Sequence, residues 1–245
     1  MVMPAGPDVA DFVARLLADT IREQPEACLG LATGGTMIPV YRRLVDIIQS
    51  QRIDTSRVTT FNLDEYVGIP RDHPQSYHAY MREALLDPGG FSADRTYMPD
   101  GMARDLTASC HAYEAAIRRV GGIDVQILGL GPNGHIGFNE PGTAADSLTH
   151  VVDLTRETRW ANARFFRGSL TPVPHQAITM GLRTIMAARR IIVVVTGRAK
   201  AAILATVLGS DPRRRYPATV LQNHARVLWC VDRAAASQLR VRGGR

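Results

Sequence analysis

The segment "IIVVVTGRAKAAI", residues 191–203, joins the pattern of a buried strand to that of a helix. Its first five residues are apolar and favour β-structure, a Thr-Gly turn follows, and the residues after the turn contain few helix breakers. The segment also holds Lys200, the one lysine among the 29 lysines and arginines of the chain. We therefore predict a strand, a turn and a helix, with Lys200 just past the strand in the first turn of the helix.

Other short apolar runs have the same strand pattern: "ACLGLA" (27–32), "RVTTFNL" (57–63), "IDVQILGL" (123–130) and "ARVLWCV" (225–231). Runs that are mostly apolar, rather than alternating with polar residues, are typical of strands buried on both faces. Amphipathic helical patterns lie between them, as at residues 8–23 and after Pro39. This alternation predicts an α/β fold with a doubly wound, mostly parallel sheet and helices on both faces, formed as a single domain over residues 1–245.

Composition excludes several classes of protein. With 245 residues and 45% hydrophobic content, the chain can bury one large core. The formal charge of +6 is spread along the chain, and we expect the one arginine run, 213–215, to be a solvated loop rather than a nucleic-acid surface. Three distant cysteines in no CxxC pair suggest neither a disulfide framework nor a zinc site. With no leader and no membrane-length apolar run, we expect a soluble cytoplasmic protein.

Polar residues follow the predicted strands, where ligands bind in such sheets. Residues 33–36, Thr-Gly-Gly-Thr, lie between a strand and a helix, and glycines there allow an anion close to the free N–H groups of the helix. The alternative is an ordinary turn. Asp64 and Glu65 follow the next strand, and a solvated strand end or a helix cap would also explain two acids in that place.

The segment "GPNGHIGFNEPG", residues 131–142, follows the strand at 123–130. Its Asn-Gly pair could form a simple hairpin turn. A hairpin does not require His135, Asn139 and Glu140 in the same loop, however. A histidine with a carboxylate five residues later is a candidate proton-transfer pair, because the acid can fix the tautomer and orientation of the imidazole.

Five segments resemble, in order, the signatures of the glucosamine-6-phosphate deaminase family: "LATGGT", "FNLDEYVGIPRDHPQSYHAYM", "LGLGPNGHIGFNEPGT", "ANARFF" and "TGRAKAAIL". The resemblance covers roughly Asp8 to Ala236. It implies a Rossmann-like fold that binds a small-molecule sugar phosphate and needs neither a cofactor nor a metal. The implied reaction converts glucosamine 6-phosphate and water to fructose 6-phosphate and ammonia, a step of amino-sugar catabolism.

The resemblance also implies the role of individual residues. Those that would bind the substrate phosphate are Gly34, Gly35, Thr36, Arg164 and Lys200. His135, oriented by Glu140, would move the proton that opens the sugar ring. Asp64 would take the proton from C2 and return it to C1.

Two features depart from the family pattern. Asn133 stands two residues before His135, where some members carry an aspartate. Asn133 remains among the expected catalytic residues, because an amide can hold an imidazole by hydrogen bonding, but Glu140 must then supply the negative charge alone. The usual first strand is missing or reduced to "MVMPAG".

The segment at about 144–175 shows no clear strand pattern, and we predict that it forms a lid carrying Arg164. Two other functions remain possible from the sequence. One is a 6-phosphogluconolactonase, which shares the fold; the other is a sugar-phosphate-sensing domain, which would need a DNA-binding unit that roughly 25 residues before the first strand are too few to form. The family includes monomers and larger homo-oligomers. We expect no allosteric activation by N-acetylglucosamine 6-phosphate, because Thr143, His150 and Val152 provide no basic pair.

Overall fold

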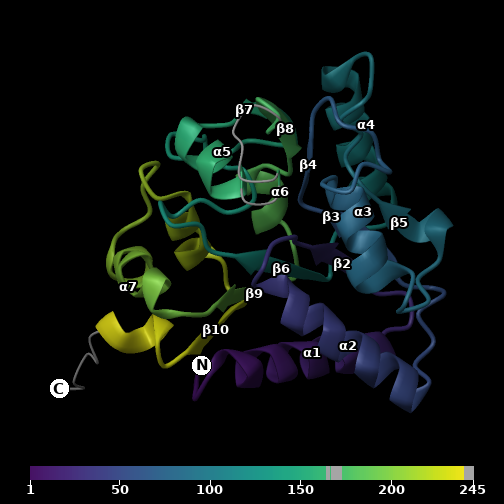
Figure 1. Cartoon of the computed structure of the whole chain (residues 1–245), viewed down its shortest axis with the longest axis horizontal. Coiled ribbons are helices and arrows are strands. Elements are labelled where there is room, and N and C mark those ends of the chain that lie inside the picture. The colour runs from purple at the N-terminus through teal and green to yellow at the C-terminus, as the bar shows by residue number, and fades with distance from the viewer. Residues whose placement is uncertain (164–165, 167–172, 240–245) are drawn as a thin grey trace.

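The computed structural model describes residues 1–163, 166 and 173–239. Its main sheet contains β1 (Val2–Met3), β2 (Cys28–Leu31), β3 (Thr59–Asn62), β5 (Thr96–Tyr97), β6 (Val125–Gly129), β9 (Arg190–Val195) and β10 (Val227–Asp232). The strand order is β1-β10-β9-β6-β2-β3-β5, and every pair is parallel (Figure 1). The predicted parallel α/β fold is confirmed. The chain runs outward from β2 on one side and from β6 on the other, so the order of the strands reverses between these two.

The strands predicted from apolar runs are all present, with ends shifted by one or two residues. The opening "MVMPAG" is reduced rather than missing as a strand, because Val2 and Met3 pair with Val231 and Asp232 at the edge of the sheet. The arginine run 213–215 is exposed, as expected of a solvated loop.

A second sheet was not predicted. It consists of β4 (Asp64–Tyr66), β7 (His150–Asp153) and β8 (Gln176–Thr179), in the order β4-β8-β7 with antiparallel pairs. The segment at 144–175, which shows no clear strand pattern in the sequence, contains β7. These strands have three or four residues each, which is too short to establish an alternating pattern, and each pairs with a segment distant in the chain.

The helices are α1 (Gly6–Glu23), α2 (Met37–Gln51), α3 (Tyr77–Met81), α4 (Leu106–Arg119), α5 (Arg156–Ala163), α6 (Leu182–Met186) and α7 (Ala201–Gly209). Short turns of 3-10 or π helix lie at Arg82–Leu86, Ala93–Arg95, Arg198–Lys200, Pro217–Asn223 and Ala235–Gln238. Within the described ranges, no helix is long and apolar enough to cross a membrane.

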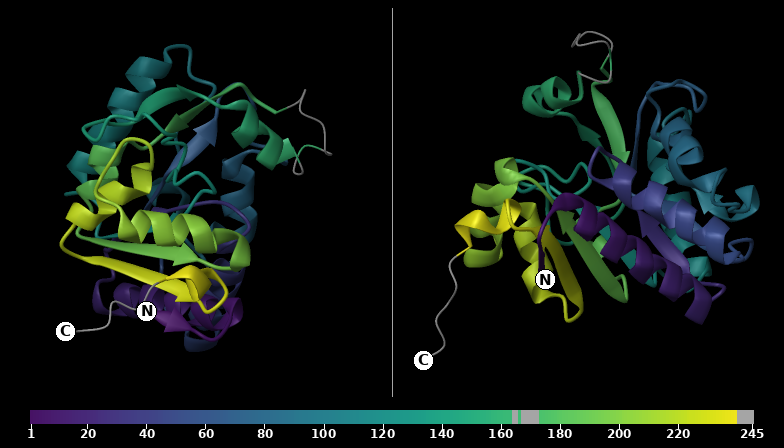
Figure 2. Two further views of the ribbon diagram at one scale, coloured as in Figure 1. Left: turned by 90° about the vertical axis from the view of Figure 1, so that its left-hand side faces the viewer. Right: turned by 60° about the horizontal axis from the view of Figure 1, so that its bottom comes forward.

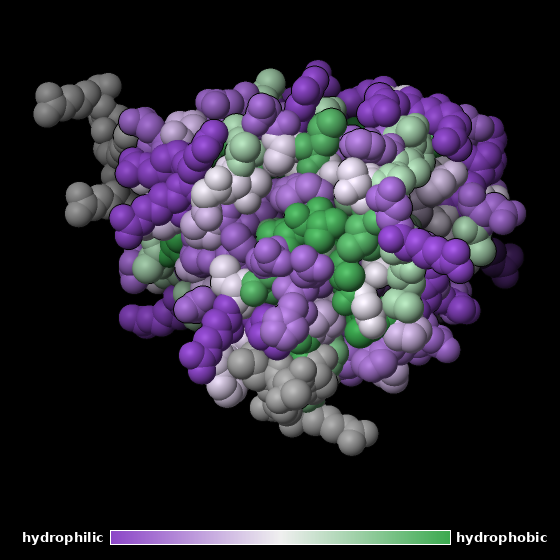
Figure 3. Space-filling view, turned by 90° about the horizontal axis from the view of Figure 1, so that it is seen from above, coloured by the Kyte–Doolittle hydropathy of each residue, from purple (hydrophilic) through white to green (hydrophobic). Residues whose placement is uncertain are grey.

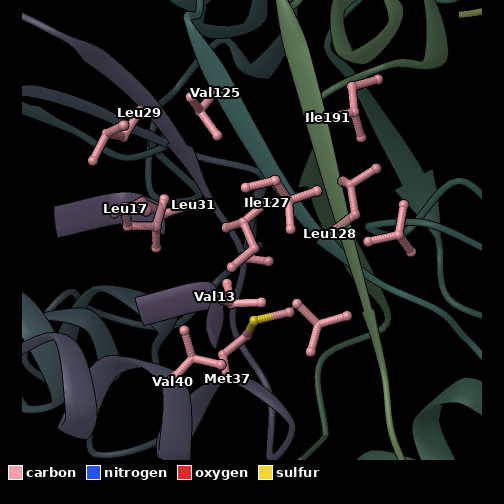
Figure 4. Close-up of a cluster of buried hydrophobic side chains, with 14 of the residues drawn as sticks. Val13, Leu17, Leu29, Leu31, Met37, Val40, Val125, Ile127, Leu128 and Ile191 are labelled. Atoms are coloured by element: carbon pink, nitrogen blue, oxygen red, sulfur yellow. The ribbon is translucent and has the colours of Figure 1, made fainter. Parts of the chain in front are cut away.

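Helices cover both faces of the main sheet. On one face, side chains of α1 and α2, among them Val13 and Met37, pack against Leu31 and Ile127 (Figure 4). Phe61 of β3 points to the opposite face, where its ring meets Tyr113 of α4 edge-on with ring centroids 5.5 Å apart. The sheet is thus buried on both sides, which explains why its strands are apolar throughout.

The second sheet has its own small core. Tyr66 of β4 packs against Phe138 and Phe166, each with ring centroids 5.7 Å from its own. Figures 1 and 2 show this sheet and α5 together at one end of the molecule, away from α1 and α2. Seen from that end, hydrophobic residues gather in the middle of a mainly hydrophilic face (Figure 3). Because Phe138 belongs to the loop after β6, this core fixes the second sheet against that loop.

Candidate active site

A cavity of about 890 Å³ lies beyond the carboxyl ends of β2 and β6, where the strand order reverses. Parallel α/β sheets bind their ligands at this position. Every predicted site residue that the structure describes lines the cavity: Gly34, Gly35, Thr36, Asp64, Asn133, His135, Glu140 and Lys200. Arg164 lies outside the described residues.

The glycine turn forms one wall of the cavity. Gly34 has a φ of +108°, a backbone conformation that side-chain-bearing residues rarely adopt, and a Cβ at Gly34 or Gly35 would meet nothing within 4 Å. The carbonyl of Gly34 accepts the N–H of Met37 at 2.9 Å and the hydroxyl of Tyr80 at 3.0 Å. The Gly34 carbonyl is thus fixed by hydrogen bonds, while the space beside the two glycine Cα atoms is free. The first N–H groups of α2 lie nearby, where they can bind an anion.

Lys200 lines the same cavity and immediately precedes α7. Its position depends on the turn at Gly197, whose N–H lies 3.1 and 2.9 Å from the two carboxylate oxygens of Asp232. Asp232 also accepts the N–H of Ala235 at 2.7 Å. Sequence reasoning missed Asp232, although an acid directly after the strand predicted at 225–231 was a usable signal.

Asp64 occupies the first position of β4, opposite Thr179. Its side chain is only 5% exposed, and its Oδ1 atom accepts no hydrogen bond from the part of the chain that the structure describes. Burial, together with the neighbouring charge of Glu65, raises the pKa of Asp64 to about 8. A carboxylate with this pKa is suited to accept and return a proton near neutral pH.

Glu65 is buried too, but its carboxylate is fully engaged. It accepts backbone N–H groups from Tyr66 at 2.8 Å, Tyr77 at 3.0 Å and His78 at 2.8 Å. Glu65 therefore caps the first turn of α3. The sequence left two explanations for these acids, a helix cap and a solvated strand end. Glu65 is a helix cap and Asp64 is not, and neither acid is a solvated strand end because both are buried.

His135 faces Glu140 across the loop that follows β6. The Nδ1 atom of His135 lies 3.7 Å from Oε2 of Glu140, which is too long for a hydrogen bond but close enough for an ionic attraction once the imidazole is protonated. A Cβ on Gly131 would fall on the His135 ring, so the imidazole occupies the space that this glycine leaves. His135 reaches the cavity only because position 131 has no side chain.

Glu140 is held at both oxygens. Oε2 accepts the Asn133 side-chain amide at 2.8 Å, and Oε1 accepts the Thr158 hydroxyl. Burial raises the pKa of Glu140, but the contacts with His135, Thr158 and Asn133 together outweigh it and bring that pKa below its usual value. The expectation that Asn133 would hold the imidazole was wrong, because its Oδ1 accepts the backbone N–H of His135 at 3.2 Å instead.

Asn139 has a structural role. It is fully buried, and its amide donates to the carbonyls of Ile136 at 2.9 Å and Met180 at 2.8 Å, which anchors the loop to the segment after β8. Sequence reasoning missed Thr158, because a threonine near the start of a helix gives no sign of a carboxylate partner elsewhere. Within the described ranges, no group of three or more His, Cys, Asp or Glu side chains is placed to hold a metal ion.

The chain resembles known proteins over nearly its whole length. Residues 5–229 match the sequence profile of the family described as glucosamine-6-phosphate isomerases/6-phosphogluconolactonase. A glucosamine-6-phosphate deaminase of Halothermothrix orenii is 49% identical over 232 residues, which are 95% of this chain and 96% of that protein. One of Rhodopirellula baltica is 48% identical over 238 residues, 97% of this chain and 94% of that protein.

Solved structures are similar as well. A monomeric glucosamine-6-phosphate deaminase superimposes with a TM-score of 0.95 at 43% identity, covering 97% of this chain and 98% of that one. A 6-phosphogluconolactonase of Trypanosoma brucei gives a TM-score of 0.75 at 22% identity, covering 98% of each chain. At that identity, the second likeness is one of fold alone.

Proposed function

Since this chain belongs to the family of glucosamine-6-phosphate isomerases and 6-phosphogluconolactonases, we propose that it is a glucosamine-6-phosphate deaminase. It converts glucosamine 6-phosphate and water to fructose 6-phosphate and ammonia. The observation that carries this proposal is the buried Asp64 carboxylate, which lines the same cavity as the His135–Glu140 pair and the glycine turn. Moving a proton between two carbons needs such a base, whereas lactone hydrolysis does not.

The phosphate group binds at the glycine turn. The N–H groups around Gly34, Gly35 and Thr36 and the ammonium of Lys200 line one cavity, which brings dipoles and a cation to a single anion. Arg164 is the second cation in this proposal. Binding the phosphate at this end sets the distance from the phosphate to the reacting carbons, and so directs C1 and C2 toward Asp64 and His135.

His135 opens the sugar ring by moving a proton between the C1 hydroxyl and the ring oxygen. Glu140 favours the protonated imidazole that forms in this step, because an ionised carboxylate lies 3.7 Å from Nδ1. Asn133 supports the pair by holding the Glu140 carboxylate and the backbone of His135.

Asp64 then acts on the open-chain sugar. It removes the proton from C2, the electron pair forms a C1–C2 double bond, and the carbonyl oxygen becomes a hydroxyl by taking up the proton that the C2 ammonium loses, which leaves a neutral amine on the double bond. Asp64 returns its proton to C1, and water hydrolyses the resulting iminium at C2 to a ketone and ammonium. The reaction is thus an aldose–ketose isomerisation coupled to deamination.

The decisive experiment measures ammonia release from glucosamine 6-phosphate beside hydrolysis of 6-phosphogluconolactone. We expect the first activity and not the second. Asp64→Asn should lower kcat by about 100- to 10,000-fold with little change in KM, because the substitution removes the base and leaves the phosphate site intact. Asp94→Asn, at an exposed position, is the matched control. Lactone hydrolysis, or near-normal turnover of Asp64→Asn, would contradict the proposal.

Two broader features belong to the same proposal. The segment at about 144–175 acts as a lid, which is supported by Thr155, Glu157 and Thr158 of its described part, since all three line the cavity. Amide hydrogen exchange of α5 should slow when a substrate analogue is added, and unchanged exchange would count against a lid.

A cytoplasmic location is supported by the three free, buried cysteines, which suit a reducing compartment.

A further inference from the structure

The two oxygens of Glu140 are fixed by residues from different parts of the fold. Oε2 accepts the amide of Asn133 and faces Nδ1 of His135, and all three residues lie in the loop after β6. Oε1 accepts the hydroxyl of Thr158, which lies 18 positions later on α5. A carboxylate held at one oxygen can still rotate, but one held at both has a single orientation. Thr158 thus decides which edge of Glu140 faces the imidazole.

The Thr158 hydroxyl is itself directed. Thr158 is the third residue of α5 and is 6% exposed. Its backbone N–H donates to Oγ1 of Thr155 at 3.1 Å, the arrangement of a helix N-cap, and the Thr155 hydroxyl donates to Oγ1 of Thr158, also at 3.1 Å. Because the Thr158 oxygen accepts that bond, its own proton is left to point at Glu140. The hydroxyls therefore form a directed chain from Thr155 through Thr158 to the carboxylate.

Removing this donor would leave Oε1 of Glu140 as a buried carboxylate oxygen without its hydrogen bond. Such an oxygen is costly, so the carboxylate would rotate toward another donor or take up a proton. Either change weakens the attraction between Glu140 and a protonated His135. Thr158 lines the cavity, but its hydroxyl donates to Glu140, so in this scheme the effect of that hydroxyl passes through the carboxylate.

We propose that Thr158 is a positioning residue whose hydroxyl orients the Glu140 carboxylate toward His135 and so joins α5 to the proton-transfer pair. The proposal deepens the deaminase function and rests on it for its kinetic consequences. The geometric part, the hold on Glu140, does not depend on the identity of the substrate.

Other ionisable groups share the cavity with Glu140. Asp64 of β4, Glu157 of α5 and Lys200 before α7 line it together with His135. His135 is the ionic neighbour that lowers the pKa of Glu140, and the Thr158 and Asn133 hydrogen bonds act in the same direction. Loss of the hydroxyl must therefore raise the pKa of Glu140, so the carboxylate stays protonated to a higher pH.

The kinetic test compares Thr158→Val, which loses the hydroxyl and keeps the branched shape, with Thr158→Ser, which keeps the hydroxyl. Thr107→Val, an exposed threonine of α4, controls for the change itself. For Thr158→Val we expect kcat to fall about 10- to 100-fold, the size of a hydrogen bond to a charged group, with KM changed less than about twofold. The portion of the acid limb of the kcat profile that Glu140 sets, which lies below the titration of Asp64, should move to higher pH. Thr158→Ser should restore most of kcat and return the limb.

A second measurement needs no activity. Carbon-13 NMR of the Glu140 carboxyl in the substrate-free protein should show a raised pKa in Thr158→Val and a wild-type pKa in Thr158→Ser. If Thr158→Val does not fold, Thr158→Ala, which also lacks the hydroxyl and favours helix, takes its place. Failure of the wild type to release ammonia would refute the deaminase function and leave this measurement valid.

The positioning role is refuted if the hydroxyl-free variant keeps the wild-type kcat, acid limb and Glu140 titration. It is also refuted if Thr158→Ser loses as much activity as Thr158→Val while both melt at lower temperature, because Thr158 would then act through packing alone.

Discussion

At the scale of single residues, Asp64 and Glu65 show how neighbouring acids of one type acquire different properties. Successive side chains of a strand point to opposite faces. Glu65 meets three backbone N–H groups at the start of α3, while Oδ1 of Asp64 accepts no hydrogen bond from the described chain. Both carboxylates are buried. Asp64 lines the cavity, and within the described part of the chain its Oδ1 atom has no backbone N–H donor like those that bind Glu65. The environment, rather than the residue type, makes Asp64 the candidate base.

The raised pKa of Asp64 can be measured. Because it is about 8, the carboxyl is protonated below that pH in the substrate-free protein and ionised above it. Carbon-13 NMR of the aspartate carboxyls should therefore show one group that titrates near pH 8 and is missing from Asp64→Asn, with Asp94→Asn as the control. The substrate ammonium should lower this pKa on binding, because a nearby cation favours the ionised form. Titration of Asp64 near pH 4 would contradict the prediction.

Lys200 gives a second prediction at this scale. An ammonium is a compact charge, whereas the planar guanidinium is larger and favours two-point contact, so Lys200→Arg should not restore the phosphate contact. We expect KM for glucosamine 6-phosphate to rise at least about tenfold, with kcat less affected and the melting temperature unchanged. Arg198→Lys, at an exposed position of the same turn, is the matched control. Wild-type kinetics in Lys200→Arg would mean that the single lysine reflects composition alone.

At the scale of elements, the loop at 131–142 works as a unit. Asn133 ties Glu140 to the backbone of His135, Asn139 ties the loop to the segment after β8, and Gly131 leaves room for the imidazole. The geometry of the His135–Glu140 pair therefore depends on residues that hold it in place rather than on the pair alone.

Gly131→Ala tests this dependence. The added methyl group would fall on the His135 ring and push the imidazole away from Glu140. We expect kcat to fall by about 100-fold or more, because proton transfer depends on position, while the protein still folds. Gly209→Ala at the end of α7, where a Cβ would meet nothing within 4 Å, is the control. A Gly131→Ala enzyme with normal kcat would show that the loop adapts and that His135 is not held as described.

At the scale of the whole molecule, the cavity is built from both sheets, and the second sheet contributes Asp64, the proposed base. The main sheet supplies the glycine turn after β2 and the His135 loop after β6, and β4 adds Asp64 from the second sheet. The site residues that the structure describes therefore line one cavity, and all of them come from a single copy of the chain.

This convergence leads to a prediction about saturation. We expect ammonia release to depend hyperbolically on glucosamine 6-phosphate and to be unchanged by N-acetylglucosamine 6-phosphate, because Thr143, His150 and Val152 offer no basic pair for a second anion. Initial rates measured with and without the acetylated sugar test this. A sigmoidal curve that becomes hyperbolic with the acetylated sugar would show an allosteric site that these positions do not reveal.

The sequence by itself determined the five inner strands of the main sheet, their parallel alternation with helices, the glycine turn and the pairing of His135 with Glu140, but not the edge strand β5. These features are encoded in local patterns: the apolar run of a strand buried on both faces, the periodicity of a helix, or two residues five positions apart in one loop. The family resemblance supplied the role expected of Asp64, which its neighbourhood in the sequence left open.

Only the tertiary structure decided which of the two acids faces the cavity, which residues hold Glu140, and that a second sheet exists. The reason is physical. The strands β4, β7 and β8 are too short to carry a pattern and form only by pairing with distant partners, and the hydrogen bond from Thr158 to Glu140 joins separate elements. The raised pKa of Asp64 likewise follows mainly from burial, with a smaller effect of the adjacent Glu65 charge, and burial depends on the folded surroundings rather than on neighbours in the chain.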